Sequence, residues 1–592
     1  MTLFVGLLFT SCLRDEEFID TDIQEVDKLL AVDLAQKLNN PYTIDNMTKA
    51  VDSIKAKLAA GDYGDLDAAV FQNLEVRPTH YYIQFSPVDE KQESILKRDS
   101  TMVLSDYPLD YEFSDAFFIT RPDLANRKIP HYYVAVPVDK KLPTEVPHKI
   151  LEELFIPEEL PAFNPKPTPF AKVSALQTQE IKNDELVLGH LLDKAHSISG
   201  YSEQLQKKET DEVGTETPES RFVGPRWTPS GTIMIWDDNI GSTTTTTTTV
   251  VGYEERPCED DDDDSLPAFP DERREPIMCS YPIYETVTTT TPGSYIPLEG
   301  AQVLIRQLFT VRQGITDANG YFSTGTVRGS ARYIIQWERY QYSIRDSWLG
   351  QAETRGPRQR SAWNHYIQDG SLSQYYGTIH RAAHHYYYKD IKGLRRPPQN
   401  DLFSTQMKIR AYNEENDNVN GSHKEERRFL GLGSQIKIYN PQNQSKDIYA
   451  TAIHELAHAS HWDLSRSDFD DSESIVKESW ARGVEWELTR IVYPNYEPVY
   501  ARLNYTGIVQ DMIDGFGSKG TLFWWDYEEE DWGSPNLYKS YYDSISGYTV
   551  RQIEDAIEGQ KTWSSWKNNI INIFENDTED SLNNSFTFWN TQ

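Results

Sequence analysis

A cluster of histidine and glutamate in segment 450–463, ATAIHELAHASHWD, has the residue types and spacing that suit metal chemistry. His454 and His458 are four residues apart, so on a helix their rings project from one face about one turn apart. Two imidazole nitrogens placed in this way can converge on one tetrahedral Zn²⁺. Glu455 follows the first histidine and is rotated enough to reach a water at the metal without binding the metal itself. The cluster therefore predicts a metal site with a general base beside it.

The residues around this cluster predict a strand followed by a helix. The strand is expected at 433–440, GSQIKIYN, and the helix over 445–464. Ser445 or Asp447 can cap the start of that helix, because both side chains can accept hydrogen bonds from free backbone N–H groups. The apolar stripe expected to face the core contains Ile448, Ala452, Ile453 and Leu456.

A second helix, predicted to begin near Asp470, supplies candidates for a third metal ligand. Asp470 and Glu473 fit a capping box, so Glu473 suits the helix end better than the metal. Glu478 has 19 residues between it and His458. Glu485 lies two turns beyond Glu478 on nearly the same face, where it can accept a hydrogen bond from a ligand histidine. The expected core face contains Ile475, Val476, Trp480, Val484 and Leu488.

The histidine motif and the glutamate spacing resemble the gluzincin family of zinc metallopeptidases. In that family a glutamate from the next helix, about 18 or 19 residues after the second histidine of the motif, completes the metal site. The resemblance implies that His454, His458 and Glu478 hold Zn²⁺, and that Glu455 is the general base that activates a zinc-bound water. It also implies a mainly helical, zincin-like metallopeptidase domain over residues 341–592.

A third histidine, His461, lies on the ligand face three residues after His458. A metzincin-type site would need glycine at position 461 and histidine or aspartate at 464, and the chain has His461 and Leu464 there, so that pattern is rejected. His461 is then either a residue that supports the ligands or lines the cleft, or a solvated histidine at the helix end. The sequence leaves both interpretations open.

A peptidase site also needs a hydrogen-bond donor for the transition-state oxyanion. The resemblance further suggests that the strand at 433–440 is the sheet edge that pairs with an extended peptide substrate. The sequence does not choose among the candidate donors, which are Tyr493, Tyr496, Tyr500, Tyr505 and Tyr548.

Residues 226–340 are predicted to form a β-sandwich. The opening PLEGAQV and the turn TDANGYF, at 316–322, resemble the transthyretin-like module called carboxypeptidase regulatory-like. Such modules support a neighbour and have no chemistry of their own. Residues 242–292 interrupt this pattern with seven consecutive threonines and an acidic run, and they are expected to be a disordered insertion. An exported compartment would permit a disulfide between Cys258 and Cys279, which the sequence leaves open.

The N-terminus, MTLFVGLLFTSC, resembles a bacterial lipobox, with a short apolar run and small residues before Cys12. On this resemblance residues 1–12 are a lipoprotein signal peptide and Cys12 carries the lipid. The following LRDEEF resembles the export signals of surface lipoproteins in Bacteroidetes-type bacteria. An outer-membrane lipoprotein exposed at the cell surface is therefore expected, with a periplasm-facing one as the variant. An ordinary cleaved signal or a buried N-terminal strand is the alternative for this segment.

Residues 13–225 are expected to form an N-terminal α+β domain and a connector. Apolar residues recur at helical spacing over 23–38 and 51–58. Aromatic and β-branched residues predict strands within 79–87 and 131–139. Either an inhibitory prodomain or a docking module fits this region.

The composition limits the classes of partner. The 592 residues carry a formal net charge of −34, which repels nucleic acid and anionic lipid, so membrane contact is expected through the anchor only. No further run approaches about 18 apolar residues, so no transmembrane helix is expected. The sequence thus predicts a multidomain α+β, surface-anchored zinc metallopeptidase that acts on proteins or peptides. The alternative is a catalytically silent lipoprotein of zincin fold that binds proteins or glycans, and the presence of Glu455 favours the enzyme.

Overall fold

The computed structural model describes the chain from residue 35 to residue 590 with internal gaps. The ranges left out within these bounds are 63–73, 114–128, 160–174, 205–225, 258–277, 347–349, 401–405, 417–418, 424–434, 502, 515–520, 524, 527–530 and 533–543. Cys12 and the predicted signal peptide therefore lie outside the described residues.

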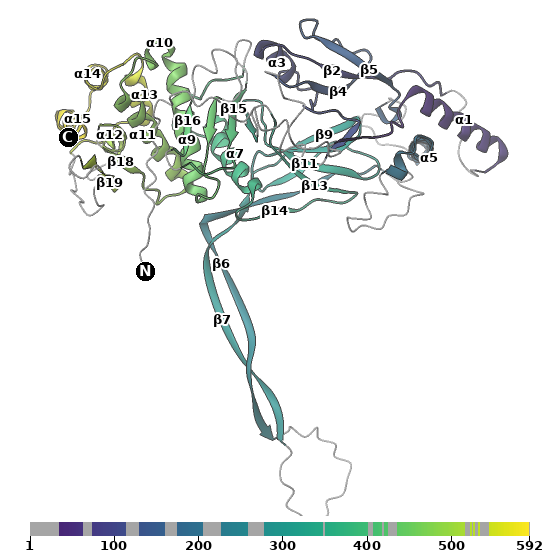
Figure 1. Ribbon diagram of the computed structural model, residues 1–592, viewed down its shortest axis with the longest axis horizontal. Helices are drawn as coiled ribbons and strands as arrows, with labels where there is room; N and C mark the ends of the chain where they lie inside the picture. Colours follow the sequence, from purple (N-terminus) through teal and green to yellow (C-terminus); the bar gives the residue numbers. More distant parts are fainter. Residues whose placement is uncertain are drawn as a thin grey trace, which may run out of the picture.

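The chain contains both helices and sheets, as expected for a multidomain α+β protein. Figure 1 shows the N-terminal elements at one end of the molecule, β-strands in the middle, and the helices that follow α9 at the other end. A long ribbon of two strands, β6 and β7, leaves the middle of the molecule.

The N-terminal unit is built on a three-stranded antiparallel sheet of order β4-β2-β5. The strands are β2 (His80–Phe85), β4 (Tyr132–Pro137) and β5 (His148–Leu154). The strands predicted within 79–87 and 131–139 are confirmed.

Helices α1 (Ile44–Ala60) and α5 (Ala175–Ser199) pack together and share a buried cluster with this sheet. The helix predicted over 51–58 is confirmed as part of α1. The helix predicted over 23–38 is wrong at its described end, because β1 (Ala35–Lys37) pairs with a later strand. The remaining elements are β3 (Tyr111–Phe113), α3 (Glu90–Lys97) and a 3₁₀ turn (Pro157–Glu159).

Two four-stranded sheets follow, with buried side chains from both in one cluster. The first sheet contains β10 (Tyr321–Ser323), β6 (Ser230–Pro257), β14 (His365–Ile367) and β7 (Met278–Pro297), with β6 in its centre. The second has the order β13 (Glu353–Gln359), β11 (Ala331–Gln336), β8 (Gln302–Gln307) and β9 (Thr310–Ile315). Because β13 and β14 come after residue 340, the layered strands extend past the predicted domain boundary.

The long ribbon corrects the prediction of a disordered insertion over 242–292 at residues 242–257 and 278–292, and the rest of that range lies outside the described residues. Within it, Ser242 to Pro257 pairs antiparallel with Met278 to Pro292, so Thr243 faces Thr291 across the two strands. Threonine is β-branched and favours extended backbone, so a threonine run forms strands even where the composition offers no core. Cys258 lies outside the described residues, and so does the predicted acidic run.

A third sheet carries the candidate site. Its order is β12 (Tyr342–Arg345), β15 (Met407–Ala411), β17 (Ile436–Ile438) and β16 (Gly421–His423). The first three strands are parallel and β16 is antiparallel to β17. The predicted strand at 433–440 is confirmed over its residues 436–438, but it lies inside the sheet. The predicted edge strand is therefore wrong: in the described part of this sheet, β16 forms the edge beside β17.

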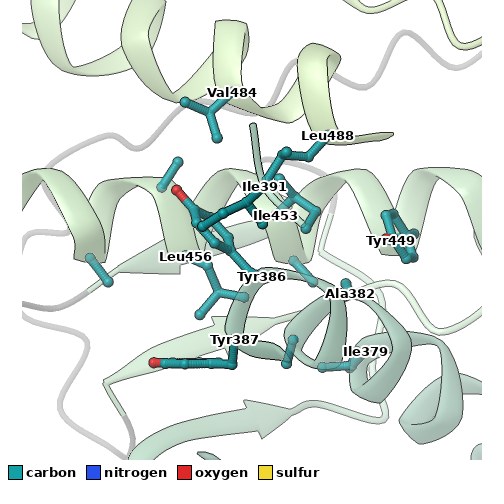
Figure 2. Close-up of a cluster of buried hydrophobic side chains, with 14 of the residues drawn as sticks. Ile379, Ala382, Tyr386, Tyr387, Ile391, Tyr449, Ile453, Leu456, Val484 and Leu488 are labelled. Atoms are coloured by element: carbon teal, nitrogen blue, oxygen red, sulfur yellow. The ribbon is translucent and has the colours of Figure 1, made fainter. Parts of the chain in front are cut away.

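Three helices pack on and beside this sheet: α7 (Leu372–Tyr388), α9 (Ser445–Leu464) and α11 (Ser474–Val492). Figure 2 shows Ile453 and Leu456 of α9 between Tyr386 of α7 and Val484 of α11, which form part of the largest buried cluster. Alanines of α9 are buried as well and favour the helix strongly. The metal-binding candidates therefore belong to a helix packed on two sides by other helices.

Shorter elements complete this end of the chain. Thr549 and Gln552 form a capping box at the start of α13. No helix within the described ranges is both long and apolar enough to cross a bilayer. The elements are α10 (Arg466–Phe469), β18 (Val499–Ala501), α12 (Ile508–Ile513), β19 (Thr521–Phe523), β20 (Trp525–Asp526), β21 (Asp531–Trp532), α13 (Val550–Ile557), α14 (Trp563–Ile573), a 3₁₀ turn (Glu579–Ser581) and α15 (Leu582–Trp589).

Candidate metal centre

Helices α9 and α11 bring His454, His458 and Glu478 together. The Nε2 atoms of the two histidines are 3.1 Å apart, and each lies 3.2 Å from Oε2 of Glu478. Among the described residues, these three form the one group of histidine, cysteine and acidic side chains whose donor atoms can hold a metal ion. Ligand atoms at about 2.0–2.2 Å from a tetrahedral Zn²⁺ lie about 3.3–3.6 Å from each other, slightly farther apart than these donor atoms. The spacing of the three donor atoms therefore suits one small metal ion.

The electrostatics of this group favour a positive charge. Burial by itself would raise the pKa of Glu478, but the two histidines hold that pKa well below its usual range. Burial lowers the pKa of His454, yet hydrogen bonds to Glu478 and Glu485 outweigh it and raise that pKa to about 9. Burial lowers the pKa of His458, and Glu478 opposes this shift only in part. The two buried carboxylates thus create a negative potential that attracts a cation as well as a proton.

Glu485 holds the ring of His454 in place. Its Oε2 lies 2.8 Å from Nδ1 of His454, so an N–H at Nδ1 donates to the carboxylate. When a metal ion displaces the proton on Nε2, the lone pair of Nε2 is left facing the other donors. Arg482 donates to both oxygens of Glu485, at 2.6 and 2.8 Å, and the hydroxyl of Tyr496 donates to Oε1. This is the contact to a ligand histidine that the spacing of Glu485 predicts.

Replacing Glu485 with glutamine is expected to weaken zinc binding by about 10- to 100-fold, the usual effect of removing the partner of a ligand histidine. The amide keeps the volume but loses the charge that fixes the Nδ1–H tautomer of His454. Competition titration against a chromogenic chelator measures the zinc Kd. Glu473→Gln is the matched control, because Glu473 accepts a hydrogen bond from the backbone N–H of Trp563 at 2.7 Å and does not face the donors. Equal affinities in Glu485→Gln and wild type would show that Glu485 does not orient the ligand.

Glu455 lies on the same helix, buried beneath the edge strand β16. Gly421 of β16 passes so close that a Cβ added there would lie 2.7 Å from Oε1 of Glu455 and 2.8 Å from Cγ2 of Thr451. No side chain larger than hydrogen fits at this position without a shift of its neighbours. The strand therefore covers the carboxylate that the sequence predicts to be the general base.

If Glu455 is the general base of a peptidase, Gly421→Ala is expected to lower kcat for peptide hydrolysis by about 10- to 100-fold while zinc affinity stays unchanged, because a displacement of about 1 Å at a catalytic group has this cost. Steady-state kinetics and the zinc titration, run on the same preparation, separate the two effects. Ser422→Ala is the control, since the next side chain along a strand points to the opposite face of the sheet. A Gly421→Ala protein with full kcat would mean that Glu455 is not held by this contact.

The N-terminus of α9 is capped by the base of the long ribbon. Neither Ser445 nor Asp447 forms the predicted cap, since the helix begins at Ser445 and its flanking residue makes no side-chain cap bond. Instead, Oδ1 of Asp238 accepts from the N–H of Ser445 and Oδ1 of Asn239 accepts from the N–H of Lys446, both at 2.9 Å. These contacts join residues 207 positions apart in sequence.

Asp238→Ala is expected to lower the free energy of unfolding by about 1–2 kcal/mol, since it removes both a cap and a negative charge at a helix N-terminus. Asp238→Asn keeps the hydrogen-bond acceptor and loses the charge, and it is expected to lower the free energy of unfolding by less than half as much. Urea unfolding followed by circular dichroism measures both. If the alanine variant is as stable as wild type, the backbone N–H groups of Ser445 and Lys446 do not depend on this cap.

His461 is buried in the structure, which excludes the solvated histidine among the two interpretations. Its ring packs edge-on against Phe469 with the ring centroids 5.0 Å apart. Burial, with the neighbouring His458, lowers the pKa of His461 to about 3, so the ring is neutral. It does not belong to the group of three donors.

The structure places the five tyrosines named as oxyanion donors in different environments. Tyr505 lies beside the site, with its ring centroid 6.1 Å from that of His454 and the Arg482 guanidinium over its face. Tyr496 is bound to Glu485, and the hydroxyl of Tyr493 donates to Asp237 at 2.7 Å. Tyr500 donates to Gln510, and Tyr548 is buried near α13. Of the five, Tyr505 has the ring nearest a candidate ligand.

The sequence-based prediction missed the contacts made by four residues, which are Arg482, Gly421, Asp238 and Asn239. Arg482 is four residues after Glu478 on α11, and this helical spacing is a signal that could have indicated it. The other three lie on strands distant in sequence, where no local pattern points to α9.

No protein-family model, curated protein or solved structure matches the chain.

Proposed function

We propose that the chain is a zinc-dependent metallopeptidase anchored to the surface of a bacterial outer membrane through lipid on Cys12. The observation that supports this most strongly is the convergence of His454, His458 and Glu478, with donor atoms 3.1–3.2 Å apart and Glu455 on the same helix.

The donor set favours a transition metal such as Zn²⁺ over Ca²⁺ and Mg²⁺. Two imidazole nitrogens and one carboxylate oxygen are the ligands of many catalytic zinc sites, in which a fourth position stays open. Oxygen-only sets, which Ca²⁺ and Mg²⁺ prefer, do not match. When bound, Zn²⁺ supplies a Lewis acid for the attacking water and the scissile carbonyl.

Residues of the chain supply the proton transfer, the orientation of the ligands and the oxyanion donor. Glu455 accepts the proton of the attacking water and delivers it to the nitrogen of the leaving amine. Glu485 and Arg482 keep the ring of His454 oriented throughout. Tyr505 is the tyrosine assigned to the oxyanion, since its ring lies next to that of His454.

The substrate is a protein or peptide in extended conformation. The edge strand β16 lies on α9 above Glu455, and an edge strand offers backbone N–H and C=O groups to an added strand. Because Gly421 leaves no side chain between the strand and the carboxylate, a peptide bond on β16 comes close to the general base.

Metal analysis combined with peptide cleavage tests this function. We expect inductively coupled plasma mass spectrometry to find about one zinc per chain in wild type, as one three-ligand centre requires, and little in His458→Ala. A quenched fluorescent peptide library should be cleaved by wild type, and cleavage should stop with 1,10-phenanthroline and return with added zinc. Zinc bound at full occupancy without cleavage of any library member would overturn the peptidase and leave a metal-binding surface protein.

A further inference from the structure

A second candidate site lies in a cleft of about 760 Å³ between the N-terminal unit and the second sheet of the middle strands. One wall is the face of β8, β11 and β13, and the other includes Tyr111 and Phe113 of β3. In Figure 1, β11 and β13 lie away from α11, and no residue of α9 or α11 lines the cleft, so the cleft is separate from the candidate metal centre.

Three arginines form a row across three neighbouring strands of this wall. Arg332 of β11 is the direct cross-strand partner of Arg306 on β8 and of Arg358 on β13. Directly opposed residues on antiparallel strands project from the same face, and all three line the cleft. Strands are about 4.8 Å apart, so the row extends over roughly 10 Å.

A β-bulge adds a fourth arginine to the same face. Arg355 and Arg358 are three positions apart on β13, so a regular strand would place them on opposite faces. The register shift on this strand pairs Arg355 with Ile334 and brings its side chain to the cleft as well. Gly356 within the shifted stretch lies against Trp363, with space for no Cβ. The bulge thus concentrates positive charge on one side of the sheet.

One carboxylate lines the cleft beside these arginines. Among the residues that line the cleft, Glu112 is the one acidic side chain, 3.5 Å from Arg332. Arg306 donates to the backbone oxygen of Pro108, and Arg355 donates to that of Phe113. No hydrogen bond or ion pair joins the side chain of Arg358 to a described residue.

The row of Arg306, Arg332 and Arg358 is costly for a fold, since like charges directly opposed across strands destabilise a sheet. A concentration of positive charge is also unexpected in a chain whose net charge is −34. Tyr107 and Trp363 add aromatic surface to the cleft walls, which suits the apolar part of a ligand. A volume of this size is in the range of small-molecule sites.

We propose that this cleft binds a small ligand that carries two or more oxyanion groups, such as carboxylate, sulfate or phosphate, on an apolar or ring-shaped body. Guanidinium groups bind each of these oxyanions in bidentate geometry. Arg332 and Arg358 hold the acidic groups, and Tyr111 and Phe113 pack against the body.

Isothermal titration of the full chain with defined probes tests the proposal. The probes are citrate, inorganic phosphate, a sulfated disaccharide and the matching neutral disaccharide. At least one multiply charged probe should bind, the neutral one should not, and affinity should fall as salt rises. The strongest charged probe identifies which oxyanion the cleft prefers. Absence of binding by every charged probe would overturn the proposal.

Two variants and one control locate the binding. Arg358→Gln and Arg332→Gln should each weaken the best probe by about ten-fold or more, the effect of losing one charge-assisted hydrogen bond. Arg358→Gln is the cleaner test, because that side chain makes no bond to a described residue and its loss should leave the unfolding temperature unchanged. Arg312→Gln on β9 changes the same charge on the same sheet outside the cleft and should bind like wild type. If Arg358→Gln and Arg332→Gln both bound the probe as tightly as wild type, the anion would bind elsewhere. The same would follow if Arg312→Gln lost as much affinity as these two variants.

Discussion

Glu455→Gln is expected to lower kcat for peptide hydrolysis by about 10²–10⁴-fold, the contribution of a general base, with zinc content unchanged. Glutamine has nearly the same volume as glutamate, so the close packing of Gly421 and Thr451 around the side chain is kept. What it lacks is the ability to take a proton. Because Glu455 is not one of the three donors, the metal should remain bound at wild-type stoichiometry.

Single-turnover cleavage of a peptide taken from the library, together with zinc analysis of the same sample, measures this loss. Asp463→Asn is the matched control on the same helix, since Asp463 is bonded to Arg466 at 2.6 Å near the helix end. It should retain wild-type kcat. A Glu455→Gln protein that cleaves at the wild-type rate would exclude Glu455 as the base, and one that has lost its zinc would show that this residue supports the metal.

Lys408→Met is expected to cost about 3–5 kcal/mol of stability, because it leaves buried carboxylates without their main partner. Lys408 of β15 is buried and lies 2.7 Å from Glu93 and 3.1 Å from Glu90, both on α3. Arg345 of β12 is a weaker partner at 3.9 Å from Glu93. The lysine thus joins the N-terminal unit to the sheet that carries the candidate metal centre. Differential scanning calorimetry and urea unfolding at pH 7 measure the loss.

The sign of the pH dependence follows from Glu93. Burial raises the pKa of Glu93, but Lys408 and Arg345 outweigh burial and lower that pKa from 4.5 to about 2. A depressed pKa contributes stability that is fully present above pH 4.5 and is lost as the pH falls toward 2. That contribution is about 3 kcal/mol at neutral pH, from about 1.4 kcal/mol for each pKa unit. The difference between wild type and Lys408→Met should therefore shrink between pH 4.5 and 2.

Lys49→Met is the control for Lys408→Met, since Lys49 forms an exposed pair with Asp45 at 2.6 Å. Exposed pairs contribute about 0–1 kcal/mol. A double variant, Glu93→Gln with Lys408→Met, should recover part of the loss because no buried charge of that pair remains. A cost for Lys408→Met no larger than that of Lys49→Met would mean that the buried pair does not hold the two parts together.

The pairing of His454 and His458 could be predicted because two histidines four residues apart share one face of α9. Glu478 was predicted through the resemblance to the gluzincin motif, since local periodicity does not report how α11 packs on α9. The contact of Glu485 with His454 then followed from the position of Glu485 two turns beyond Glu478. Element types were predictable where hydrophobic alternation was strong, as in β2 and β4.

What could not be predicted depends on partners far away in the sequence. The acceptors of Asp238 and Asn239 meet α9 across 207 positions, which no local pattern reports. The edge strand β16 is three residues long and contains Gly421, so it lacks the alternation that identifies a strand. The threonine ribbon was missed because its composition argues against a core, whereas two paired strands satisfy their backbone hydrogen bonds without one.

The order in which the chain adds strands to its sheets determines how its parts unfold. After β11 the chain enters the third sheet as β12, returns to the middle strands as β13 and β14, and then continues into α7. Side chains from β11, β12 and β14 and from α7, α9 and α11 form one continuous buried cluster. A cut at residue 340 would therefore separate strands from their own sheets, and the two parts are expected to melt in one cooperative transition. Ligand binding at the helical end then raises the melting temperature of the layered strands as well, by mass action on a shared folded state.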